Sequence, residues 1–138
     1  HNIGRMEVIS KQPLVILDAA HNPQGARALS ISLQQVLPAS KRVLVCGLLD
    51  DKDLENTLAP LLPSTRLCVV TRPDNPRGHR WQRVGRFIER CYPHIEQLLV
   101  ANNSEAVETA LRLRQDDEYL LITGSFYILD QCRAYFNA

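Results

Sequence analysis

Short unbroken apolar segments alternate along this chain with longer segments in which apolar residues recur every three or four positions. The first pattern, rich in β-branched residues, is typical of strands buried on both faces, and the second of amphipathic helices. We expect strands at residues 4–9, 14–17, 42–46, 67–71, 95–101 and 119–123. We expect helices between them, among them 24–37, one lined by Leu54, Leu58 and Leu61, 104–114 capped by Ser104, and a closing helix.

Strands joined by crossovers of a dozen or more residues pair in parallel. The alternation therefore predicts an α/β fold, a three-layer Rossmann-like domain with a mostly parallel sheet of about six strands and helices on both faces. The 138 residues contain no repeat and no internal linker, so we expect one domain over residues 1–138.

One strand end combines polar side chains in a way that suggests a site. The buried strand of residues 14–17 stops at Asp18, and His21 follows in the turn before Asn22 and Pro23, a good helix cap and a good first helical residue. Ligands of open α/β sheets bind just past the carboxyl ends of strands. Two simpler interpretations stay open: Asp18 caps the turn, and His21 is a core histidine bonded to backbone.

A second strand end repeats this arrangement at Thr123, Gly124 and Ser125. Helix N-termini attract carboxylates and phosphates, although a tight turn at Gly124 with Ser125 as a cap would explain these residues too. Two such ends facing one crevice predict an anion or nucleotide site.

Composition narrows the function classes. The net charge is +1 and no apolar segment is long enough to span a bilayer, so we expect neither nucleic acid nor membrane as a partner. Cys46, Cys68, Cys91 and Cys132 show no C-x-x-C spacing, and we interpret them as buried thiols of a cytoplasmic protein. No phosphate loop, no G-x-G-x-x-G after a strand and no metal-ligand spacing occurs, so we expect no metal site in this chain.

Five short motifs occur along almost the whole chain. In chain order they are Gly4-Arg5-x-Glu7, Leu17-Asp18-Ala19-Ala20-His21-Asn22-Pro23, Gly47 with Lys52-Asp53, Pro76-Arg77 and Thr123-Gly124-Ser125-Phe126-Tyr127. In this order they resemble the carboxy-terminal domain of folylpolyglutamate synthase/dihydrofolate synthase, a family of the ADP-forming Mur ligase superfamily. Asp-Ala-Ala-His-Asn-Pro together with Thr-Gly-Ser-Phe-Tyr is specific, whereas neither is so alone. One departure is Ile3, where the family usually has proline.

The resemblance implies an ATP-dependent ligase that joins L-glutamate to the carboxylate of a folate or dihydropteroate. ATP would phosphorylate that carboxylate, and the amino group of glutamate would attack the acyl phosphate. The ATP-binding domain, with the phosphate loop and the Mg²⁺ ligands, would lie upstream of this chain. We therefore expect a fragment that packs against its own upstream domain and is inactive without it.

The same resemblance assigns roles to individual residues. Arg5 and Asp18 match ATP contacts, with Asp18 accepting hydrogen bonds from the ribose. His21 and Ser125 match positions that hold the incoming glutamate. Asn22 and Arg77 are further candidates for substrate contacts.

Two alternatives remain. The tetrapeptide Asp74-Asn75-Pro76-Arg77 is similar to the diaminopimelate-recognition motif of a muramyl-peptide ligase, and an arginine in a proline-stiffened loop suits a carboxylate. A non-catalytic receiver-type module shares the strand and helix alternation. However, Thr71-Arg72 and Thr123-Gly124 stand where it needs an aspartate and a lysine.

Overall fold

The computed structural model describes residues 5–137 and contains one six-stranded sheet. In the order β1-β2-β6-β3-β4-β5, only β1 runs antiparallel to its neighbour. The strands are β1 (Glu7–Lys11), β2 (Leu14–Asp18), β3 (Lys41–Cys46), β4 (Thr65–Val70), β5 (Glu96–Leu99) and β6 (Glu118–Thr123). The α-helices are α1 (Pro23–Val36), α2 (Leu54–Leu58), α3 (Arg83–Cys91), α4 (Asn103–Leu113) and α5 (Phe126–Asn137).

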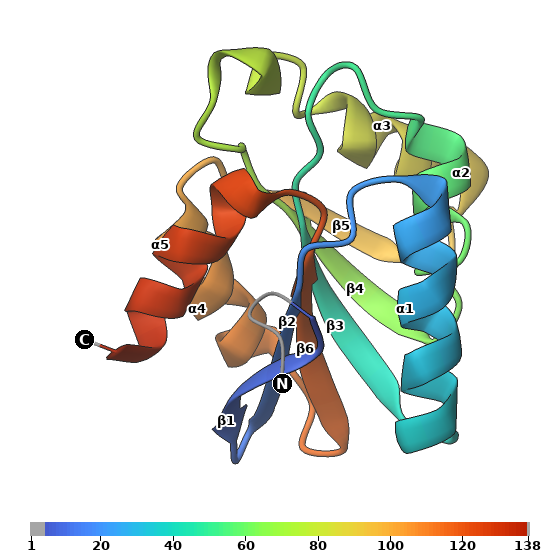
Figure 1. Ribbon diagram of the computed structural model, residues 1–138, viewed down its shortest axis with the longest axis vertical. Helices are drawn as coiled ribbons and strands as arrows, with labels where there is room; N and C mark the ends of the chain where they lie inside the picture. The colour runs from blue at the N-terminus through green and yellow to red at the C-terminus, as the bar shows by residue number, and fades with distance from the viewer. Residues whose placement is uncertain (1–4, 138) are drawn as a thin grey trace.

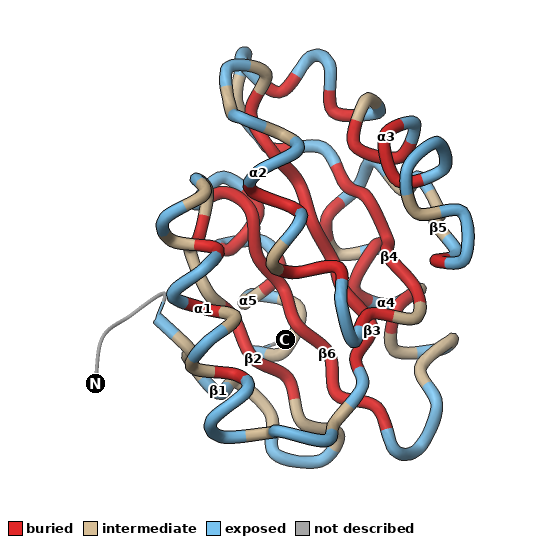
Figure 2. Tube along the Cα trace, turned by 90° about the vertical axis from the view of Figure 1, so that its right-hand side faces the viewer, coloured by how far each residue is buried: buried red, intermediate tan, exposed pale blue. Residues whose placement is uncertain are grey.

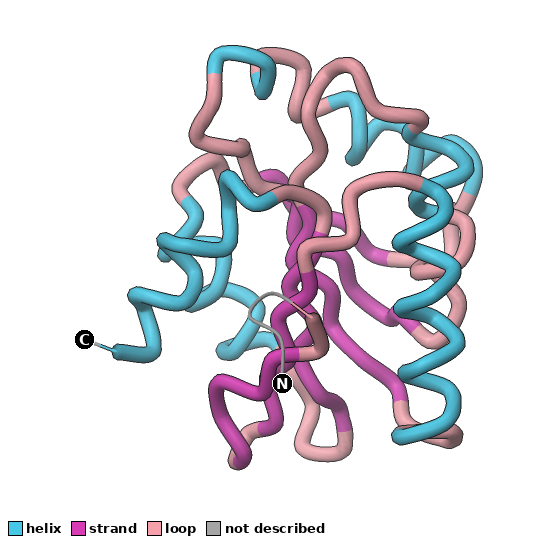
Figure 3. The backbone as a smooth tube through the Cα atoms, viewed as in Figure 1, coloured by secondary structure: helices cyan, strands magenta, loops and turns pink. Residues whose placement is uncertain are grey.

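The helices form two layers, with α1, α2 and α3 on one face of the sheet and α4 and α5 on the other (Figures 1 and 3). The predicted three-layer α/β architecture is therefore confirmed. Successive strand side chains point to opposite faces, so Leu44 and Cys46 join the core under α1 while Val43 and Val45 join the core under α4 and α5. Figure 2 shows the central strands buried along most of their length. Each such aliphatic side chain contributes about 1.5–3 kcal/mol through burial.

Several local expectations need correction. Helix α2 ends at Leu58, because the chain turns there, yet Leu61 is still buried in that turn. The cap of α4 is Asn102, whose side chain accepts from the amide of Glu105 at 2.9 Å, so Ser104 lies inside the helix. Cys91 is exposed at the last position of α3, whereas the other cysteines are buried. Among the described residues, no helix is long and apolar enough to cross a membrane.

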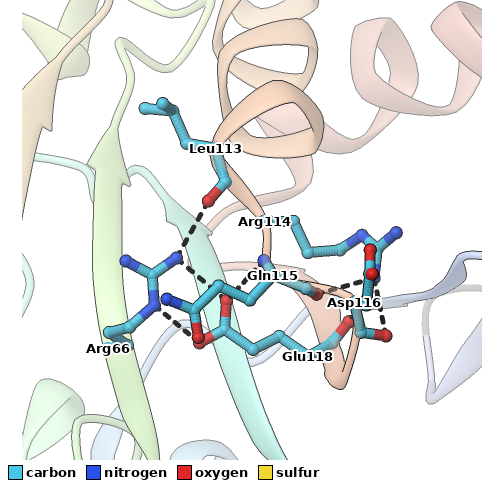
Figure 4. Close-up of polar contacts among 6 residues, drawn as sticks. All are labelled: Arg66, Leu113, Arg114, Gln115, Asp116 and Glu118. Atoms are coloured by element: carbon cyan, nitrogen blue, oxygen red, sulfur yellow. Dashed lines mark hydrogen bonds and ion pairs between the residues drawn. The ribbon is translucent and has the colours of Figure 1, made fainter.

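An ion pair fastens the sheet at the amino ends of β4 and β6 (Figure 4). The buried carboxylate of Glu118 accepts two hydrogen bonds from Arg66, at 2.7 and 2.9 Å, and one from the amide of Gln115 at 2.9 Å. Arg66 also donates to the carbonyl of Leu113 at the end of α4. Burial of Glu118 by itself would raise its pKa, but these hydrogen bonds and the positive charges of Arg66 and Arg114 outweigh it and lower the pKa.

We predict that Glu118→Gln lowers the free energy of unfolding by about 2 kcal/mol at pH 7, because a charge-assisted pair is lost. A lowered pKa means that the native state gains stability above the ordinary pKa of glutamate, about 4.3, and loses it as the pH falls. Urea unfolding should therefore show a smaller difference in the free energy of unfolding between the unsubstituted protein and Glu118→Gln at about pH 3 than at about pH 7.

The matched control is Asp51→Asn, which removes the exposed pair between Asp51 and Arg77. The side chains of both residues are exposed to solvent, so the loss of this pair should change the free energy of unfolding by less than about 0.5 kcal/mol. An equal deficit of Glu118→Gln at both pH values would contradict the role of the charge.

Candidate functional site at the carboxyl ends of β2 and β6

The register of the sheet brings the two predicted strand ends together. Asp18, the last residue of β2, pairs with Thr123, the last residue of β6, and Thr123 pairs with Cys46 on the other side. The hydroxyl of Thr123 also donates to the carbonyl of Ala20 at 3.3 Å. The turns leading to α1 and α5 therefore start side by side, at the upper end of the sheet in Figure 1.

Gly124 makes this close arrangement possible. Its φ of +123° lies in the region that favours glycine, and a Cβ at this position would collide with the carbonyl of Gly47. A Cβ on Gly47 would in turn lie 2.7 Å from the carbonyl of Thr71. The chain can therefore leave β6, β3 and β4 in this tight packing only with glycines at these two positions.

The carboxylate of Asp18 holds two segments of backbone together. Its Oδ1 accepts from the amide of Ala20 at 2.8 Å, as the capping interpretation predicts. Its Oδ2 accepts from the amide of Met6 at 2.9 Å, across twelve residues of sequence. Met6 has a φ of +42°, uncommon for a residue with a side chain, and the bond to Asp18 fixes this conformation. Asp18 thus ties the segment that carries Arg5 to the first turn after β2.

Burial and these hydrogen bonds act on the pKa of Asp18 in opposite directions. Burial raises the pKa of its carboxyl above the ordinary value, although the amides of Met6 and Ala20 and the charge of Arg5 act in the opposite direction. Each carboxylate oxygen accepts one amide and keeps a further lone pair, so Asp18 can still accept from a ligand.

His21 follows Asp18 in the turn before α1, and its ring contacts Ala19 on one side and Phe126 on the other. Its Nδ1 lies 2.9 Å from the carbonyl of Ala19, and its ring centroid lies 6.1 Å from that of Phe126 in a tilted arrangement. The residue is only partly buried, so the core-histidine interpretation is wrong, although its bond to backbone is present. The contact with Phe126 joins the turn after β2 to the turn after β6.

A cavity of about 740 Å³ opens over these groups. It runs from Asp18 along α1, past residues spaced one helical turn apart, and its size is that of a small-molecule site. It is lined by Arg5, Met6, Asp18, Ala19, Ala20, His21, Asn22, Gln24, Gly25, Ala28, Leu29, Ser32 and Phe126. Gln24, Ser32 and Phe126 are not among the predicted site residues. The four-residue spacing of 24, 28 and 32 could have indicated one common face of α1, and Phe126 directly follows the predicted Ser125.

Other candidate residues are placed differently. Asn22 lines the cavity, but its Oδ1 caps α1 by accepting from the amide of Gly25 at 2.8 Å. Ser125 is buried, does not line the cavity, and uses its hydroxyl oxygen to accept from the amide of Tyr127 at 3.1 Å. Arg77 lies on another loop, exposed and paired with Asp51 at 3.1 Å. Gly4 and Ile3 of the first motif fall outside the described residues.

The lining of the cavity combines charged, polar and apolar groups, as small-molecule sites do. Arg5 supplies a permanent positive charge, Asp18 and the polar side chains of α1 supply hydrogen-bonding groups, and Phe126 with the alanines supplies apolar surface. Within residues 5–137 no group of three or more histidine, cysteine, aspartate or glutamate side chains could hold a metal ion.

Comparison with known proteins identifies the family. The family model of the Mur ligase glutamate ligase domain matches residues 4–126. The chain belongs to the Mur ligase family. Among the relatives of this Mur ligase domain, the dihydrofolate synthase/folylpolyglutamate synthase of Escherichia coli is 31% identical over 126 residues, which are 90% of this chain and 28% of the relative.

A muramyl-peptide ligase is similar as well. The UDP-N-acetylmuramoyl-L-alanyl-D-glutamate–2,6-diaminopimelate ligase of Helicobacter pylori is 28% identical over 127 residues, which are 88% of this chain and 27% of that protein. A crystal structure of a bifunctional folylpolyglutamate synthase/dihydrofolate synthase with Mn, AMPPNP and L-glutamate bound superposes with a TM-score of 0.85 at 29% identity. The match covers 100% of this chain and 32% of that one, so the Mur ligase domain spans about a third of such proteins.

The protonation of Asp18 gives a direct test of the site geometry. We predict that the amide signals of Met6 and Ala20 titrate together, with one midpoint above about 3.9, the ordinary pKa of aspartate. Proton–nitrogen correlation spectra at decreasing pH would measure this midpoint. In the control Asp18→Asn both amides should stop titrating, and a midpoint at or below the ordinary value would contradict the burial of this carboxyl.

Proposed function

We propose that residues 1–138 are the carboxy-terminal domain of an ATP-dependent ligase that adds L-glutamate to folate or dihydropteroate through an acyl phosphate. The observation that carries this proposal is the cavity in which Arg5, Asp18 and His21 meet. It is supported by the similarity to a synthase whose structure holds AMPPNP, Mn and L-glutamate.

In this proposal Arg5 and Asp18 serve the nucleotide. Arg5 brings a cation to the ATP, and the free lone pairs of Asp18 accept hydrogen bonds from the ribose. The clamp from Asp18 to Met6 also sets where Arg5 lies. Mg²⁺, the physiological counterpart of the Mn in the similar structure, would be held mainly by residues of the upstream domain.

In this proposal the incoming glutamate binds in the same cavity, next to the nucleotide. His21 contacts the incoming glutamate directly, with Asn22 beside it at the start of α1. Ser125 is buried and does not contact the glutamate directly. Its hydroxyl caps the turn before α5, and this turn holds Phe126 against His21. Arg77 lies outside this cavity and would reach the substrate only from the neighbouring loop.

The partners follow from the size of the domain. The chain spans about a third of the similar synthase, so its own upstream ATP-binding domain would close over the cavity and complete the site. We further propose that the ligase works in the cytoplasm, because Cys46, Cys68, Cys91 and Cys132 are free thiols, which are typical of a reducing compartment.

A diaminopimelate-adding muramyl ligase is the second candidate, favoured by the Helicobacter pylori relative. The loop with Asp74 and Arg77 is fastened to α5, since the amide of Asp74 donates to the carbonyl of Tyr127 at 3.1 Å. The loop therefore lies at the same end of the sheet as the cavity, but the arginine itself is paired with Asp51.

The two candidates predict different products from the full-length ligase that carries this chain. We expect ADP release with ATP, L-glutamate and either dihydropteroate or folate, measured by a coupled assay. The isolated chain should release no ADP under the same conditions. Activity only with diaminopimelate and a muramyl dipeptide would establish the second candidate instead.

Kinetics of two variants would test the division of the cavity. We predict that Asp18→Ala weakens the use of ATP by about 1.5–3 kcal/mol, or about 10- to 150-fold in KM for ATP, because a charge-assisted contact is lost. Ser125→Ala should instead raise the KM for glutamate more than that for ATP. The matched control Asp130→Ala removes an exposed carboxylate of α5 that lies outside the cavity, and it should leave both KM values unchanged. A reversed pattern would show that the two roles are exchanged.

A further inference from the structure

We propose that His21 is the base that removes a proton from the amino group of the incoming amino acid. This inference rests on the proposed ligase function and gives His21 a chemical step in addition to binding. At neutral pH the α-amino group of an amino acid is an ammonium, which has no lone pair and cannot attack an acyl phosphate. A ligase that uses such a substrate therefore needs a proton acceptor beside the nitrogen.

The hydrogen bond of His21 fixes which nitrogen can act. The carbonyl of Ala19 only accepts, so the Nδ1 atom 2.9 Å away must carry the hydrogen. In the neutral ring the lone pair is then on Nε2, which has no hydrogen-bond partner among residues 5–137. When Nε2 takes a proton, the bond from Nδ1 to Ala19 is kept, and the carbonyl stabilises the imidazolium that forms. The ring can thus change its charge without moving.

The surroundings of the ring support this role. Phe126 packs against it and limits the orientations it can adopt. The other ionisable residues that line the cavity are Arg5 and Asp18. Arg5 cannot accept a proton. Asp18 is fixed by two backbone amides, and the proposed function assigns its remaining lone pairs to the ribose of the nucleotide. His21 is therefore the one lining side chain, among the described residues, with an uncommitted basic nitrogen.

The proposed step balances as follows. The ammonium of the amino acid gives one proton to Nε2, which leaves a neutral amine and an imidazolium. The amine nitrogen then attacks the acyl phosphate carbon, the carbon–oxygen bond to phosphate breaks, and inorganic phosphate leaves with that electron pair. After the attack the nitrogen carries two protons: one goes to solvent or to the departing phosphate, the other stays as the amide N–H, and the imidazolium returns its proton to solvent.

The ring geometry can be measured on the 138-residue chain itself. Nitrogen NMR of the imidazole of His21 should show hydrogen on Nδ1 and a lone pair on Nε2 in the neutral form. The opposite tautomer would overturn the proposal, because Nε2 would then have no lone pair with which to take a proton.

The kinetic test uses the full-length ligase with His21→Gln, which can hydrogen-bond at the position of Nε2 but cannot take a proton. At about pH 7 we expect kcat/KM for glutamate to fall about 100-fold, and the deficit to shrink at least about tenfold by about pH 9.5, where more of the substrate is free amine. Hydroxylamine, an amine that is unprotonated at neutral pH, should still trap the acyl phosphate as a hydroxamate in this variant.

His94→Gln is the matched control, since His94 is exposed and lies outside the cavity, and it should behave as the unsubstituted ligase does. A deficit of His21→Gln that is the same at all pH values would overturn the proposal in favour of a binding role. An equal loss of hydroxamate would overturn it in favour of a role in acyl phosphate formation. If the unsubstituted ligase releases no ADP and forms no hydroxamate, the proposed function fails as well.

Discussion

The parallel pairing of β6 with β2 on one side and β3 on the other is the constraint on which the site depends. Hydrogen bonding at fixed register places the last residues of the three strands, Asp18, Thr123 and Cys46, in one row. Each strand then turns away at this row, and Gly124 passes so close to Gly47 that no Cβ fits between them. His21, just before α1, and Phe126, at the start of α5, thereby come into contact.

The two ends of β6 serve different purposes. At its amino end, Glu118 is neutralised by Arg66, and this ion pair together with its backbone contacts joins β4, β6 and the end of α4. At its carboxyl end, β6 pairs with Asp18 of β2, whose carboxylate accepts two backbone amides and keeps lone pairs. The ion pair and the proposed ligand site therefore lie at opposite edges of one sheet, the proposed site at the carboxyl edge, where open α/β sheets bind ligands.

Asp18 and His21 share a mode of attachment to the backbone. The carboxylate is held by amide donors and the imidazole by a carbonyl acceptor, so each ring or carboxyl plane is oriented before any ligand arrives. Preorganised polar groups lose less entropy when they bind and are more effective in catalysis. The cost is a partly buried carboxylate, and burial is the largest influence on its pKa.

The sequence alone determined the fold class, the carboxyl ends of β3 and β6 and the cap of α1, because these follow from local apolar periodicity and from the chemistry of Asn22 and Pro23. It also predicted that Asp18 and His21 lie at the carboxyl edge of the sheet, which is where the structure places them. Only the tertiary structure decided that Asp18 holds Met6, that Phe126 holds His21, and that Ser125 is buried. Those contacts join segments far apart in sequence, and a pattern along one strand or helix carries no information about them.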